Sequence, residues 1–204
     1  MSLTINSFYR SGGVFSFYLF NKIVDAGANI DHNPETYSDS TKKQLVIFRN
    51  PYEAIPSCII KRQVDSNVAG QEIGNSQITE LAIEYLNYIN LAKSNSSQLY
   101  IANFENIKND PISEIKKIAK FFDFEIKEDF NSTNEEVYAE IENEMRNTPT
   151  STQTSLMTDH DGHLPREKNE SRLKADKAVL ECDIQELKQC YEEYINLNYT
   201  SVEL

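Results

Sequence analysis

The sequence contains no tryptophan and only three cysteines among its 204 residues. The cysteines, Cys58, Cys182 and Cys190, are few and odd in number, so no disulfide framework is expected. They form no Cys-x-x-Cys pair and no Cys/His cluster, so a structural zinc site is not expected either. Reduced thiols are typical of a cytoplasmic protein, and we expect that location.

Long apolar runs and a recognisable targeting signal are also missing. Residues 1–6 lack the basic and then apolar layout of a secretory signal peptide. The longest apolar run, residues 14–20, contains Ser16 and falls well short of the roughly 20 residues that cross a bilayer. We therefore expect no membrane segment.

Positive charge is scarce, because 20 Lys and Arg face 32 Asp and Glu, for a net charge of −12. Such acidity argues against nucleic acid or an anionic membrane as the main partner, since both repel it. It serves solubility or, alternatively, attracts a basic substrate. The positions of the few cations are therefore informative about where an anion could bind.

The apolar pattern predicts strands that alternate with helices. We predict strands over residues 3–8, 44–48 and 99–102, and helices over 14–24, 77–93, 111–122, 134–146 and 174–197, with another helix starting at Pro51. Residues 28–43 are interpreted as a loop with a short strand at 29–30, residues 64–76 as a mobile loop, and residues 147–172 as a flexible loop.

Alternation of this kind implies parallel strands, because parallel pairing needs crossover connections. The expected architecture is α/β: one domain over residues 1–204, built as a three-layer α/β/α sandwich around a small parallel sheet, with residues 174–197 as a closing helix. Ligands of such sheets lie beyond the carboxyl ends of the strands.

A glycine-containing turn joins the first strand to the first helix. Gly12 and Gly13 let backbone N–H groups approach an anion, the helix N-terminus adds partial positive charge, and Arg10 adds a full charge. The turn lacks the GxxxxGK[ST] pattern of nucleotide triphosphatases. The alternative is a plain turn that needs glycine for its backbone angles.

Arg49 follows the strand over residues 44–48, and Ser57 comes eight residues later. Both could converge on one phosphate at the same edge of the sheet. The alternatives are a surface salt bridge for Arg49 and a helix hydroxyl with a local partner for Ser57.

Together these motifs resemble the sulfotransferases that use 3′-phosphoadenosine 5′-phosphosulfate (PAPS), which have a P-loop-like fold. Residues 100–111 are similar to the family's strand and Tyr-Glu-Asp-Leu segment, and residues 163–168 to its basic C-terminal loop. The resemblance implies that the phosphosulfate is held by Arg10, Ser11, Gly12, Gly13 and Val14. It implies that the 3′-phosphate is held by Arg49 and Ser57, with Arg166 and Lys168 closing over it.

The chain departs from the family at the donor loop. Gly13 and Val14 stand where two hydroxyl residues are usual, so Ser11, Ser16 or the backbone must supply those hydrogen bonds. Arg10 stands where lysine is common; its far higher pKa makes it a poorer proton donor and leaves electrostatic stabilisation. The short segment before Arg49 implies a small or open acceptor pocket.

Sulfuryl transfer requires a base for the acceptor. The resemblance places His32 in this role, because many members carry a histidine in that segment, and histidine titrates near neutrality. A solvated loop histidine is the alternative reading of His32. Glu35 is a second candidate for the base.

The predicted function is transfer of a sulfuryl group from PAPS to a hydroxyl or amine of a small molecule or glycan. The alternatives are a non-catalytic relative that binds the donor and a nucleotide-dependent phosphotransferase. No metal is expected, although His160 and His163 lie close in sequence to Asp159 and Asp161. Arg172 belongs either to the phosphate clamp or to a solvated basic loop.

Overall fold

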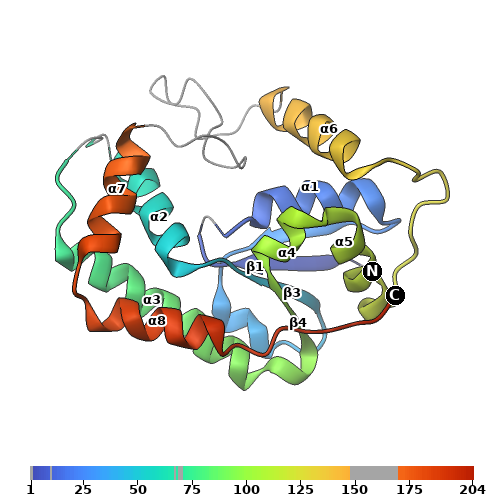
Figure 1. Cartoon of the computed structure of the whole chain (residues 1–204). Coiled ribbons are helices and arrows are strands. Elements are labelled where there is room, and N and C mark those ends of the chain that lie inside the picture. Colours follow the sequence, from blue (N-terminus) through green and yellow to red (C-terminus); the bar gives the residue numbers. More distant parts are fainter. Residues whose placement is uncertain (1, 10, 67, 69–70, 148–169) are drawn as a thin grey trace.

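The computed structural model describes residues 2–9, 11–66, 68, 71–147 and 170–204 (Figure 1). The strands are β1 (Leu3–Ser7), β2 (Ala28–Asp31), β3 (Lys43–Phe48) and β4 (Leu99–Asn103). The helices are α1 (Gly13–Ile23), α2 (Pro51–Asp65), α3 (Asn75–Ser94), α4 (Phe104–Asn109), α5 (Pro111–Phe122), α6 (Asn134–Asn147), α7 (Glu170–Glu181) and α8 (Gln185–Ile195), with 3₁₀ turns η1 (Pro34–Ser38) and η2 (Ser96–Gln98).

The four strands form a parallel sheet in the order β2-β1-β3-β4. In its middle, Ile5 of β1 pairs with Ile30 of β2 and Leu45 of β3. All strands point the same way, so the segments after β1, β2, β3 and β4 emerge at one edge of the sheet. The predicted α/β class and parallel sheet are confirmed.

Helices cover both faces of the sheet, which gives three layers (Figure 1). Successive β3 residues face opposite cores: Leu45 and Ile47 pack with side chains of α1, α5 and α6, whereas Val46 and Phe48 pack with side chains of α2, α3 and α8. None of the described helices is both long and apolar enough to cross a membrane.

The C-terminal prediction is wrong in two respects. The single helix predicted over residues 174–197 is replaced by two helices, α7 and α8. They are separated by a short segment in which Ile184 takes an extended conformation. The break allows α7 to pack on α2 and α8 to pack on α3, which one straight helix could not do (Figure 1). A single helix would have placed Cys182 and Cys190, two helical turns apart, on one face, but Cys182 lies between α7 and α8. The predicted loop over 147–172 is also too long at both ends, since α6 includes Asn147 and α7 begins at Glu170.

The segment between β2 and β3 is tied to the core rather than solvated throughout. Tyr37 is fully buried, and the Gln44 amide donates to the carbonyl oxygens of Thr36 (2.7 Å) and Asp39 (3.2 Å). Gln44 in turn accepts a hydrogen bond from the Asn6 amide at 2.9 Å. This buried network fixes the segment that begins with His32.

We expect Gln44→Ala to lower the free energy of unfolding by about 2–3 kcal/mol, because it leaves the buried Asn6 amide without its acceptor and removes one of the two donors to each of the Thr36 and Asp39 carbonyl oxygens. Urea unfolding followed by circular dichroism measures this. Gln77→Ala, at an exposed position of α3, is the control and should change little. Equal stability of the two variants would show that the network does not hold the segment.

Candidate functional site

The turn between β1 and α1 leaves an open helix N-terminus. Gly12 is the N-cap of α1 with φ 91° and ψ 10°, a left-handed conformation that favours glycine, and the Ser11 amide donates to the Phe8 carbonyl at 3.1 Å. Within the described chain no side chain caps α1, and its first turn holds no acidic residue. Its first amide groups are therefore available to an anion.

Three serine hydroxyls surround this turn. Ser7, Ser11 and Ser16 are at most 1% exposed, and their Oγ atoms have no hydrogen-bond partner among the residues the structure describes. Buried hydroxyls are normally paired, so three unpaired ones at one turn mark it as a candidate ligand site. The sequence pointed to Ser11 and Ser16 and missed Ser7, although it ends the strand that leads into the loop.

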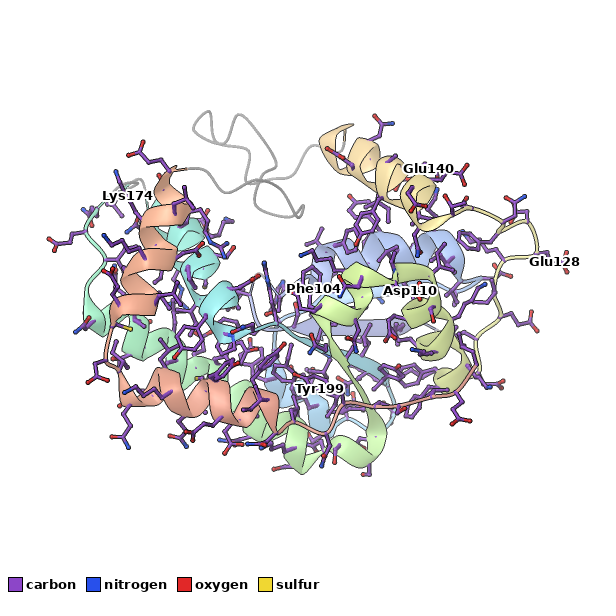
Figure 2. All side chains as sticks on the ribbon, viewed as in Figure 1. Phe104, Asp110, Glu128, Glu140, Lys174 and Tyr199 are labelled. Atoms are coloured by element: carbon purple, nitrogen blue, oxygen red, sulfur yellow. The ribbon has the colours of Figure 1, made fainter. Side chains whose placement is uncertain are left out.

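The two glycines are required by close packing. A Cβ on Gly13 would lie 2.5 Å from Ser7 Oγ, and one on Gly12 would lie 2.1 Å from ring atoms of Phe104. Phe104 opens α4 directly after β4, where Figure 2 labels it. The ends of β1 and β4 thus meet at the glycine turn.

Arg49 reaches the same place from the end of β3. Its guanidinium carbon lies 5.4 Å from the centroid of the Phe104 ring, within the range of a cation–π contact. The ring therefore contacts both the glycine turn and Arg49. Sequence reasoning missed Phe104, whose position directly after a strand at the ligand edge was the available signal.

Glu53 holds the Arg49 guanidinium from the first turn of α2. Its Oε2 accepts from Arg49 Nε at 3.0 Å and also from Arg49 Nη2. Ser57, buried, follows one helical turn after Glu53, so the three residues succeed one another at intervals of four. The buried Tyr85 hydroxyl, whose pKa is raised by burial, donates to the Arg49 carbonyl.

Helix α7 docks on this turn of α2 through Arg172. Its Nη2 donates to the Glu53 carbonyl at 2.7 Å, and its Nε donates to Asp176 Oδ1 at 2.7 Å. The ion pair is largely buried, at 15% and 12% side-chain exposure. Arg172 is thus engaged in helix packing. Arg10, Arg166 and Lys168 lie outside the described residues.

His32 follows β2 and is tied to the end of β1. Its Nδ1 lies 3.0 Å from the Ser7 carbonyl oxygen, and because a carbonyl can only accept, this nitrogen carries the proton. In the neutral ring Nε2 then has the free lone pair. Tyr88, whose pKa is raised chiefly by burial, donates its hydroxyl proton to the His32 carbonyl.

The structure also describes two other residues that the sequence analysis singled out. Val14 is in the first turn of α1 and partly buried, and Glu35 is exposed in η1. Among the described residues no group of three or more His, Cys, Asp and Glu side chains could hold a metal. His160 and His163 lie outside that part of the chain.

We expect Gly13→Ala to destabilise the protein by about 2 kcal/mol, because the new Cβ would press on Ser7 Oγ. Adding Ser7→Ala leaves the Ser7 Cβ as the nearest side-chain atom, at an ordinary 3.4 Å. The double variant should therefore recover about 1 kcal/mol relative to the sum of the single changes, measured by urea unfolding. Simple additivity would argue against this contact.

Comparisons with known proteins identify the family and the fold of this chain. The family model described as the sulfotransferase domain matches residues 14–195, a range that begins just after the glycine turn. A search of curated proteins found no match.

Among solved structures, mouse sulfotransferase SULT7A1 complexed with PAP is similar over 95% of this chain and 88% of its own, with a TM-score of 0.54 and 15% identity. At this identity the likeness shows the fold alone. The family is shown by the domain match, which spans most of the chain: this protein belongs to the sulfotransferase family of enzymes.

Proposed function

We propose that this protein transfers a sulfuryl group from PAPS to a hydroxyl or amine of a small molecule or glycan. One observation carries the proposal. The Phe104 ring packs against the glycine turn at the uncapped N-terminus of α1 and also lies next to the Arg49 guanidinium. The two sites suit the two separate anionic ends of this donor. Family membership supplies the reaction type.

The glycine turn is proposed to hold the 5′-phosphosulfate. The fit is supported by the uncapped amides of α1 and by the orphaned hydroxyls of Ser7, Ser11 and Ser16. The serines compensate for the hydroxyl residues that Gly13 and Val14 replace. Arg10 adds the charge that stabilises negative charge on the bridging oxygen.

The 3′-phosphate is proposed to bind Arg49 and Ser57. In support, Arg49 is oriented by Phe104 and by Glu53, and Ser57 lies on the same stretch of α2. Arg172 anchors α7 to that stretch of α2. Lys168 comes only four residues before Arg172, and four residues of extended chain span about 14 Å at most. Arg166 and Lys168 are therefore proposed to close over this phosphate.

His32 is proposed to be the general base. With Nδ1 committed to the Ser7 carbonyl, Nε2 is the atom that takes the acceptor's proton. The acceptor oxygen or nitrogen then forms a bond to sulfur, the bond from sulfur to the bridging oxygen breaks, and adenosine 3′,5′-bisphosphate is left. Bound PAPS supplies the sulfuryl group, and the chain supplies positioning and charge.

We expect Arg49→Ala to weaken binding of adenosine 3′,5′-bisphosphate about 10- to 100-fold, because a charge-assisted contact is lost. Binding of adenosine 5′-monophosphate should change little. Isothermal titration calorimetry measures both. Arg62→Ala is the matched control, because Arg62 lies on α2, the helix that follows Arg49, and also pairs with carboxylates, those of Glu80 and Glu84, at 2.9 and 2.7 Å.

Two results would contradict the donor site. One is equal affinity of the wild-type protein for the bisphosphate and the monophosphate. The other is an equal effect of Arg49→Ala and Arg62→Ala on the bisphosphate.

We expect His32→Asn to lower turnover by about 10²- to 10⁴-fold while leaving bisphosphate affinity unchanged. The asparagine amide can still donate to the Ser7 carbonyl, so only the Nε2 lone pair is removed. Sulfated product is measured with labelled PAPS over a panel of alcohols, phenols, amines and sugars. Glu35→Gln is the control and should retain activity.

Full activity of His32→Asn together with loss in Glu35→Gln would move the base to Glu35. Donor binding without turnover of any acceptor by the wild-type protein would instead favour a non-catalytic relative.

A further inference from the structure

The guanidinium proposed to bind the 3′-phosphate already has an anionic partner. Glu53 Oε2 accepts from both Nε and Nη2 of Arg49, and thus covers one whole edge of the fork. Neither group is freely solvated, at 18% side-chain exposure for Arg49 and 37% for Glu53. The pair is therefore less screened than a fully exposed one.

Three contacts confine this pair to one place. The Phe104 ring lies 5.4 Å from the Arg49 guanidinium carbon, the Tyr85 hydroxyl donates to the Arg49 carbonyl, and Arg172 donates to the Glu53 carbonyl. A phosphate that binds Arg49 would have to share the fork with the Glu53 carboxylate or displace it. In either case like charges are brought close together.

We propose that Glu53 is an intramolecular competitor for the 3′-phosphate, which lowers the affinity of the site for every 3′-phosphorylated nucleotide. This inference rests on the proposed function. Its effect is confined to one end of the ligand, because the first turn of α1, at the other end, holds no acidic residue. The consequence is faster release of the bisphosphate product.

The variant Glu53→Gln removes the negative charge of this side chain and keeps its shape. Its amide oxygen can accept from Arg49 as the carboxylate does, so the guanidinium keeps its orientation while the negative charge is lost. The same helix offers a matched control in Asp65→Asn, because Lys61 and Asp65 form an ion pair at the same spacing of four residues. Residues 53 and 65 lie about 18 Å apart along the helix, beyond the screening length of about 8 Å at physiological salt.

The experiment is calorimetric titration of wild type, Glu53→Gln and Asp65→Asn with adenosine 3′,5′-bisphosphate and with adenosine 5′-monophosphate. We expect Glu53→Gln to bind the bisphosphate about 5- to 20-fold tighter, as expected when a like charge is removed near a bound phosphate. The monophosphate should bind all three proteins alike, and Asp65→Asn should match wild type. Thermal unfolding checks that each variant is folded.

Unchanged or weaker bisphosphate binding in Glu53→Gln would overturn the proposal and make Glu53 a residue that orients Arg49. Equal tightening of both nucleotides, or equal tightening in Asp65→Asn, would overturn it as a general charge effect. Failure of the proposed function looks different, because wild type itself would then show no Arg49-dependent preference for the bisphosphate.

Discussion

The close approach of three chain segments at the carboxyl edge of the sheet is the constraint on which the rest of the site depends. Ser7 at the end of β1 leaves no room for a side chain at Gly13, and Phe104 after β4 leaves none at Gly12. Because these segments lie so close together, the Phe104 ring contacts both the glycine turn and Arg49. The same end of β1 holds the His32 ring through the Ser7 carbonyl.

This packing explains why a strongly acidic protein can be proposed to bind a polyanion. At long range a net charge of −12 repels nucleotides, although salt screens that repulsion beyond about 8 Å. Binding must therefore come from local donors, such as backbone amides and buried hydroxyls. Gathering neutral donors at the α1 N-terminus needs little net positive charge, which suits this composition.

The cations that the structure describes near the site are not isolated charges. Arg49 is paired with Glu53 of α2, and Arg172 with Asp176 of α7. Arg172 also joins α7 to the helix turn that carries Glu53. The site proposed for the 3′-phosphate thus adjoins the contact between α2 and α7, because Glu53 takes part in both.

By itself, the sequence determined the α/β class, the order of strand, glycine turn and helix, and the position of Arg49 at a strand end. These features depend on short-range signals, as in α5, where Asp110 accepts from the Ser113 amide and Pro111 starts the helix at the predicted residue. The tertiary structure alone decided where the last predicted helix breaks, because α7 and α8 pack on different partners. It also decided which nitrogen of His32 is free and which residues hold α7 against α2, because those contacts join residues 25 and 119 positions apart. No local pattern in the chain encodes contacts at such separations, since they arise only when the layers pack.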